Sequence, residues 1–336
     1  ALLSGIAEIG IIFLLFLVGL DLPTQKLKNM LGKSLLTALG TTAVFFSAGG
    51  LVMLSFGFSM TEAVIVGMGV TFSSTILGVK LLPTTVLHHR HVGEIVISLL
   101  LVQDLLAIVA LILIGYLAGS SEQDGTALLT LTLGLPALIA GALATVKFAI
   151  LPLLQRFDDF HEYIFLLAIG WCLAIAQVAH MCGLSYEVGG FIAGVSLATS
   201  PIAQYIANHL KPLRDFFLVM FFFTVGASIN LQVLSSVWMP IAALAFVILL
   251  IKPWTFTQLL TMQGETMSSA KEVGLRLGQA SEFSLLVSYM ALNASLLGAK
   301  SAAVLQAATV LTLLINSYLV VSKYPNPIAA DPALRR

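Results

Sequence analysis

Residues 67–78 read GMGVTFSSTILG, and residues 274–283 read GLRLGQASEF. Each stretch places Gly, Ser, Thr, Gln or Glu near the middle of a long apolar segment. In a membrane, such residues are typical of a broken helix, whose free N–H and C=O groups need polar partners and can coordinate a cation. The same residue types also form close contacts between continuous helices. The two stretches therefore predict two helix breaks, with close helix packing as the alternative.

A constant offset relates the two stretches. LFLVGLDL around Gly19 resembles FFFTVGASINL around Gly226, 207 residues later, and the same offset places Gly67 on Gly274. Seven predicted membrane spans separate each landmark from its counterpart, and an odd number implies opposite orientation in the membrane. This pattern is typical of the inverted repeats of secondary transporters. It predicts one transport domain, 1–336, with repeats at approximately 1–118 and 163–322.

The composition is that of a membrane protein. Of 336 residues, 59% are hydrophobic and 10% are Asp, Glu, Lys or Arg, against about 45–50% and about 25% in soluble domains. The formal net charge is +0. These values exclude a soluble enzyme, a disordered protein and a nucleic-acid-binding protein, so we expect no nucleic-acid partner.

Eleven apolar segments are candidates to cross the lipid bilayer, which requires about 20 residues in a helix. Because every backbone hydrogen bond must then be internal, the sequence predicts an all-α polytopic fold. One of these segments, 185–200, is short and rich in Gly. The predicted spans are 3–20, 34–56, 60–82, 93–118, 127–151, 163–182, 185–200, 213–231, 237–261, 270–297 and 300–322.

The distribution of Lys and Arg supports this count of spans. If the spans alternate in direction, all but three of the 16 Lys and Arg residues lie on one side of the membrane. The exceptions are Lys300 on the other side, and Lys252 and Arg276 within spans. Because positive charge marks the cytoplasmic side, the C-terminus is predicted to be cytoplasmic.

Four ionisable residues lie away from the ends of the predicted spans: Asp104, Lys252 and Glu282 are deep, and Arg276 is nearer the cytoplasmic side. A charge at the bilayer centre costs at least about 2.5–3.5 kcal/mol, so such residues usually mark an ion or proton path. Alternatively, Asp104 and Lys252 form a structural ion pair. A lysine at this depth must pair, deprotonate or contact the carbonyl groups of a broken helix. The transport and structural interpretations are compatible with each other.

The chemistry follows from the Gln-Asp pair. A buried carboxylate such as Asp104 can bind either a proton or a monovalent cation, and this mutual exclusion is sufficient for exchange. The adjacent Gln103 cannot titrate, so the pair offers one exchangeable charge. An intramembrane protease would need paired Asp residues, or Ser with His, at depth, whereas the spans contain one central Asp and no central His.

At these residues the chain resembles the cation:proton antiporter-2 family, in particular its Kef-type potassium/proton branch. The resemblance implies thirteen helices, of which eleven lie in this chain and two N-terminal ones are missing, with two crossing broken helices and a homodimer. It also implies a location in the inner membrane of a cell. The matching stretches are EIGIIFLLFLVGLDL, the SST of TFSSTILG, LLLVQDLLAI, GGFIAGVSLA, FFFTVGASINL and RLGQASEF.

The resemblance assigns roles to individual residues. Asp104 would be the carboxylate that binds the cation or the proton, next to Gln103. The first crossover would contain Ser73, Ser74 and Thr75. The second crossover and its charge compensation would involve Lys252, Arg276, Gln279 and Glu282.

The same resemblance sets the expected function: antiport of K⁺, or alternatively Na⁺, against H⁺ by alternating access, with no cofactor and no enzymatic activity. The loop between the seventh and eighth spans lacks the acidic stretch of glutathione-gated members, which puts glutathione gating in doubt. A cytoplasmic regulatory domain or subunit stays an expected partner. The alternative function is a ligand-gated or passive K⁺ channel, although the chain has no TVGYG-like filter.

Overall fold

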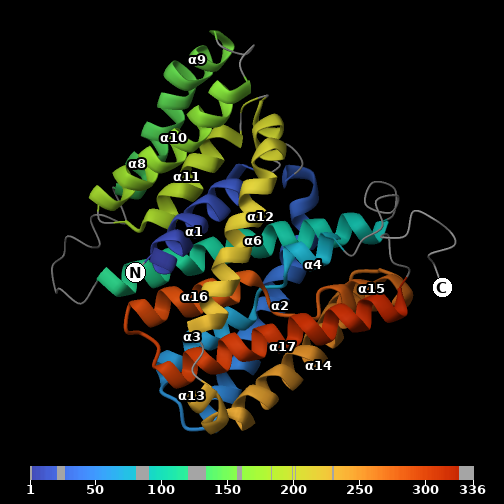
Figure 1. Cartoon of the computed structure of the whole chain (residues 1–336). Coiled ribbons are helices and arrows are strands. Elements are labelled where there is room, and N and C mark those ends of the chain that lie inside the picture. The colour runs from blue at the N-terminus through green and yellow to red at the C-terminus, as the bar shows by residue number, and fades with distance from the viewer. Residues whose placement is uncertain are drawn as a thin grey trace, which may run out of the picture. The chain divides into compact units, whose positions relative to one another are not determined.

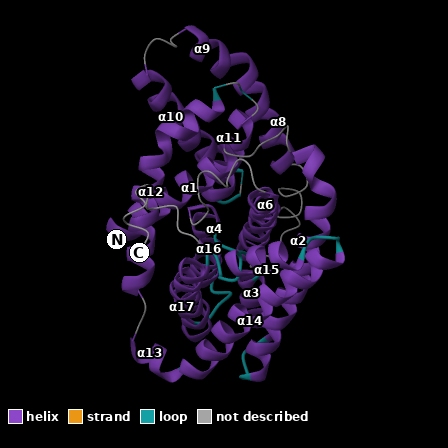
Figure 2. Ribbon diagram, turned by 90° about the vertical axis from the view of Figure 1, so that its right-hand side faces the viewer, coloured by secondary structure: helices purple, strands orange, loops and turns teal. Residues whose placement is uncertain are grey.

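The structure is a computed structural model that describes residues 2–20, 27–80, 91–119, 134–156, 161–182, 184–198, 200, 202–228 and 231–324. Within these ranges the chain is helical or forms short connections, without strands (Figure 2). The all-α prediction is therefore confirmed. The helices are α1 (Leu2–Leu20), α2 (Leu27–Ser55), α3 (Met60–Val70), α4 (Thr75–Lys80), α6 (His91–Gly119), α8 (Leu135–Thr145), the π-helical turn η2 (Val146–Ile150), α9 (Leu151–Arg156), α10 (His161–Met181), α11 (Tyr186–Ala198), α12 (Ala203–Ser228), α13 (Leu231–Ser236), α14 (Trp238–Met262), α15 (Met267–Arg276), α16 (Glu282–Asn293) and α17 (Ala299–Lys323).

Each of the eleven predicted spans corresponds to one or more of these helices. Six helical segments of the described chain are long and apolar enough to cross a membrane, so the protein is a multi-pass membrane protein. Two boundaries differ clearly: α12 begins at Ala203, whereas the predicted span begins at 213, and α2 begins at Leu27, whereas its span begins at 34. The predicted start at 127 lies outside the described residues. Five of the first ten residues of α12 are polar, including Asn208, His209 and Lys211, so hydropathy did not reveal them.

The chain divides into two compact units. Unit 1 comprises Ala1–Lys26 and Leu111–Ser228, and unit 2 comprises Leu27–Ala110 and Ile229–Arg336. In unit 1, α11 packs against α1 and α10. Gly190 and Gly194, four residues apart on α11, both face the backbone of α1, which is a frequent arrangement of closely packed membrane helices.

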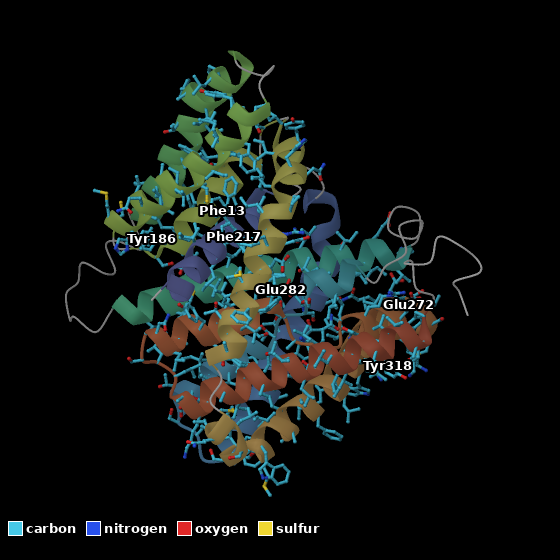
Figure 3. All side chains as sticks on the ribbon, viewed as in Figure 1. Phe13, Tyr186, Phe217, Glu272, Glu282 and Tyr318 are labelled. Carbon is cyan, nitrogen blue, oxygen red and sulfur yellow. The ribbon has the colours of Figure 1, made fainter. Side chains whose placement is uncertain are left out.

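The helices of unit 1 also make aromatic contacts. Phe13 of α1 stacks on Phe217 of α12 with ring centroids 5.5 Å apart and an interplanar angle of 4° (Figure 3). The Gly contacts and this stacked pair join α1 to both α11 and α12. The predicted span 185–200, although short, is therefore a well-packed helix of this unit.

Unit 2 contains both predicted breaks. Its long helix α14 lies beside α2, α15 and α17 (Figure 1). Helix α3 ends at Val70 and α4 begins at Thr75, while α15 ends at Arg276 and α16 begins at Glu282. The intervening residues, 71–74 and 277–281, are called the first break and the second break below. The prediction of two broken helices is confirmed.

Local structure repeats at the offset of 207 residues seen in the sequence. In each half a glycine with positive φ precedes the broken helix, a hydroxyl residue then caps its first part, and a serine at the end of the break caps its second part. These equivalent pairs are Gly57 and Gly264, Ser59 and Thr266, and Ser74 and Ser281.

A close glycine contact repeats at the same offset. A Cβ atom added to Gly67 of α3 would lie 2.6 Å from the carbonyl oxygen of Phe46 on α2. A Cβ atom added to Gly274 of α15 would lie 2.5 Å from the carbonyl oxygen of Pro253 on α14. Phe46 and Pro253 are themselves 207 residues apart. Each broken helix therefore packs on the preceding long helix through an equivalent glycine.

We expect Gly67→Ala and Gly274→Ala each to lower the melting temperature of the purified protein in detergent. The new methyl group would overlap a backbone oxygen that cannot move without its helix, and overpacking of this kind costs about 1–3 kcal/mol. Gly170→Ala in α10 is the matched control, because nothing lies within 4 Å of its Cβ position and Ala favours the helix. Thermal unfolding followed by tryptophan fluorescence compares the variants. Unchanged melting temperatures for both unit 2 variants would contradict the proposed contacts.

Candidate functional site

The ammonium group of Lys252 on α14 joins the two breaks. Its Nζ atom donates hydrogen bonds to the carbonyl oxygens of Phe72, at 2.7 Å, and Gln279, at 2.9 Å. The side chain is 1% exposed, and Nζ lies 5.1 Å from the ring centroid of Phe45. Carbonyl groups freed by a break need donors at this depth, and a charged donor gives the stronger bond. Lys252 thus satisfies one carbonyl group in each break.

Ser73 makes a second link between the breaks. Its hydroxyl donates to the carbonyl oxygen of Leu277 at 2.9 Å, and its backbone N–H donates to Oε1 of Gln103 on α6 at 3.1 Å. Because a backbone N–H can only donate, this contact fixes which way the Gln103 amide points. Gln103 therefore holds the first break against α6.

Asp104, the next residue of α6, lies at the end of the same break. The hydroxyl oxygen of Thr75 is 3.1 Å from Oδ1 and 3.2 Å from Oδ2 of this carboxylate, and Asp104 is 6% exposed. A hydroxyl has one proton, so it donates to one carboxylate oxygen at a time. The other acceptor positions of Asp104, and the lone pairs of the Thr75 hydroxyl, can face a further ligand.

Ser74 and Glu282 lie at the starts of the helices that follow the breaks. The hydroxyl of Ser74 accepts a hydrogen bond from the backbone N–H of Leu77 at 3.2 Å and so caps α4. Glu282 is the first residue of α16 and is 5% exposed (Figure 3). Its Oε2 accepts a hydrogen bond from Ser281 at 3.3 Å. The offset of 207 residues pairs Glu282 with Thr75.

Arg276 makes its ion pair within its own helix. Its Nη2 atom lies 2.8 Å from Oε1 of Glu272, one turn earlier on α15, and its guanidinium carbon lies 5.2 Å from the ring centroid of Tyr324. Among the ion pairs of the described residues, none joins Asp104 to Lys252. Lys252 instead makes the carbonyl contacts that were the alternative to that ion pair.

Two residues of α17, Thr312 and Asn316, contact the second break and were missed from the sequence. Both are buried, at 0% and 2% exposure. Together with Gln306 and Thr309 they form a polar face at helical spacing in an otherwise apolar span. That spacing was the available signal.

The arrangement brings the carboxylate of Asp104 next to the hydroxyl of Thr75 at the end of the first break. Hydrogen bonds to α6, α14 and the second break hold the first break in place. Carboxylate and hydroxyl oxygens can bind a proton or a cation, whereas the break carbonyl groups of Phe72, Leu277 and Gln279 already accept bonds from Lys252 or Ser73. The site thus has the chemical groups for competition between a proton and a cation at Asp104.

Known proteins resemble this chain over most of its length. The family described as "Sodium/hydrogen exchanger, transmembrane" matches residues 2–321. K(+) efflux antiporter 4 of Arabidopsis thaliana is 27% identical over 324 residues, covering 94% of this chain and 54% of that protein. K(+) efflux antiporter 6 of the same organism is 27% identical over 330 residues, covering 95% and 54%.

The chain spans about half the length of these curated relatives. The similarity confirms the cation:proton antiporter resemblance read from the two breaks and the Gln-Asp pair. The match also covers α1 through most of α17, so it includes both units and every residue of the candidate site. The chain therefore belongs to the sodium/hydrogen exchanger family.

Proposed function

We propose that this chain forms the transport domain of a monovalent cation/proton antiporter, with K⁺ as the favoured cation and Na⁺ as the alternative. The observation that carries this proposal is the buried carboxylate of Asp104 against the hydroxyl of Thr75, at the end of a helix break. The preference for K⁺ is supported by the relatives, which are named K(+) efflux antiporters.

In the proposed mechanism Asp104 binds either the proton or the cation. The ionised carboxylate accepts the hydrogen bond of Thr75 and binds the cation, whose second ligand is the oxygen of the same hydroxyl. Protonation removes the negative charge and with it most of the affinity for the cation. Alternating access then exposes Asp104 to each side of the membrane in turn, and each half-cycle needs one of the two ligands bound.

Lys252 has a different role in this proposal. Its two hydrogen bonds go to carbonyl groups, which do not titrate, so they persist whether Asp104 carries the proton or the cation. Lys252 therefore maintains the shape of the breaks throughout the cycle and does not compete with the cation. Arg276, paired with Glu272, stabilises the end of α15.

The proposal includes the cellular setting and the partners. The predominance of Lys and Arg on one side favours a cytoplasmic C-terminus, and the family resemblance favours the inner membrane of a cell. A homodimer and a cytoplasmic regulatory domain or subunit are the proposed protein partners. The chain is proposed to use no cofactor apart from the transported ions, and to have no enzymatic activity.

We expect Asp104→Asn to abolish cation/proton exchange in proteoliposomes while the protein stays folded. Asn has nearly the same shape but cannot bind or release a proton, so neither half-cycle can proceed. Asp215→Asn is the matched control, because Asp215 lies in α12 with its side chain 46% exposed and beside Arg214. Dequenching of a pH-sensitive dye upon cation addition measures exchange. Full activity of the Asp104 variant would refute the assignment of this carboxylate.

The same assay separates an antiporter from a passive channel. Proteoliposomes with an outward proton gradient are challenged with K⁺, Na⁺, Li⁺ and Rb⁺ in turn, in the presence of thiocyanate, a membrane-permeant anion that clamps the membrane potential without carrying cations. Under this clamp an antiporter still moves protons across the membrane, in the direction opposite to the cation. Cation flux without proton movement would favour the channel.

We expect Lys252→Met to lower the stability of the protein by about 1–3 kcal/mol, because two buried carbonyl groups lose their charged donor. The midpoint pH of exchange should move by less than about one unit, whereas loss of a direct ion-pair partner of Asp104 would move it upward by about 1–3 units. Thr255→Val, one turn along α14, is the control, because the hydroxyl of Thr255 bonds to Ile251 of its own helix. Melting curves and pH profiles test both statements, and a large upward shift would contradict the separate role of Lys252.

A further inference from the structure

The helix that follows each broken helix contacts the break through a side chain. Helix α6 follows the first broken helix, α17 follows the second, and the offset of 207 residues maps 92–116 onto 299–323. On α6, Gln103 accepts the hydrogen bond of the Ser73 backbone N–H at 3.1 Å. On α17, Thr312 accepts that of the Ala280 backbone N–H at 3.3 Å. Ser73 and Ala280 are equivalent under the offset, so α17 has the same relation to the second break as α6 has to the first.

Asn316 lies one turn after Thr312 and binds the second break more extensively. Its Nδ2 atom donates to the carbonyl oxygen of Leu275 at 3.0 Å and to Oε1 of Gln279. A carboxamide nitrogen has two protons, so it can satisfy both acceptors together. The carbonyl of Leu275 accepts only, which fixes the orientation of the Asn316 amide and, in turn, that of Gln279.

These contacts lead to the candidate ion site in a short series of bonds. The carbonyl oxygen of Gln279 accepts a bond from Lys252, whose ammonium also holds Phe72 in the first break. Three residues after Phe72, at the start of α4, Thr75 contacts Asp104. A displacement of Gln279 would therefore loosen the Lys252 contacts and move the hydroxyl that faces the carboxylate.

We propose that Asn316 is a positioning residue of the transport site, which fixes the second break and thereby the geometry of Thr75 and Asp104. This inference rests on the antiport function proposed above. The proposal requires no contact between Asn316 and Asp104, because the hydrogen bonds of Asn316 go to Leu275 and Gln279. It acts through Gln279 and Lys252, so it sets the affinity for the cation more than the rate of the transport cycle.

The test compares three variants in proteoliposome exchange. Asn316→Leu removes the amide and keeps the size of the side chain, and we expect the cation concentration at half-maximal rate to rise about tenfold, as for the loss of one buried hydrogen bond, with a smaller change in maximal rate. Gln279→Met removes the acceptor of the Asn316–Gln279 hydrogen bond, so it should also raise the cation concentration at half-maximal rate. Ser317→Ala is the matched control on α17, because the hydroxyl of Ser317 bonds to Leu313 of its own helix, and it should not change the half-saturating concentration.

A double-mutant cycle distinguishes positioning from a general loss of stability. If Asn316 acts through Gln279, the double variant should raise the half-saturating concentration no more than the larger single effect. A purely structural role would lower the melting temperature and the active fraction but leave that concentration unchanged. If Asn316→Leu does not fold, Gln279→Met alone must show the rise.

The outcomes separate this inference from the proposed function. Exchange by the wild-type protein, with unchanged half-saturation in the folded Asn316→Leu or Gln279→Met variants, would overturn the positioning role and leave the antiporter intact. Additive effects of the two substitutions would also overturn it. Absence of exchange in the wild-type protein would refute the proposed function, and this inference with it.

Discussion

A carbonyl group without a hydrogen-bond donor inside a membrane costs several kcal/mol, and each broken helix creates such groups. In this protein Lys252 supplies donors to one carbonyl group of each break, and Ser73 of the first break supplies one to Leu277 of the second. The carbonyl groups of each break therefore depend on donors from outside their own broken helix. The position of Thr75, and its contact with Asp104, depends on this mutual support, because α4 begins where the first break ends.

The two repeats meet this constraint with the same backbone features and different side chains. A glycine contact fixes the first half of each broken helix, and a serine caps the second half. The next helix then accepts a backbone N–H of the break through Gln103 in one repeat and Thr312 in the other. Caps and glycine contacts depend on backbone geometry, so they persist where the side chains around them have diverged.

The parts of this structure that follow from local chemistry could be predicted from the sequence. Apolar length predicted the spans, and the polar residues of FSST and GQASE predicted the breaks. The partner of Lys252 could not be predicted from the sequence. An ion pair with Asp104 and hydrogen bonds to carbonyl groups would both require a lysine at this depth, so the sequence pattern is the same for the two. Ser74 caps α4, a role that only the position of the break reveals. Asn316 was missed because its partners, Leu275 and Gln279, become neighbours of α17 through packing.

The charged groups break the symmetry that the backbone keeps. Under the offset of 207 residues, Asp104 corresponds to Leu311 and Lys252 corresponds to Phe45. The carboxylate thus belongs to the helix after the first break, while the ammonium belongs to the helix before the second. Because the hydrogen bonds of Lys252 go to the carbonyl groups of Phe72 and Gln279, a change of ligand at Asp104 need not break them. A scaffold whose hydrogen bonds end on carbonyl groups, and not on Asp104, can keep its shape while a proton and a cation replace each other at Asp104.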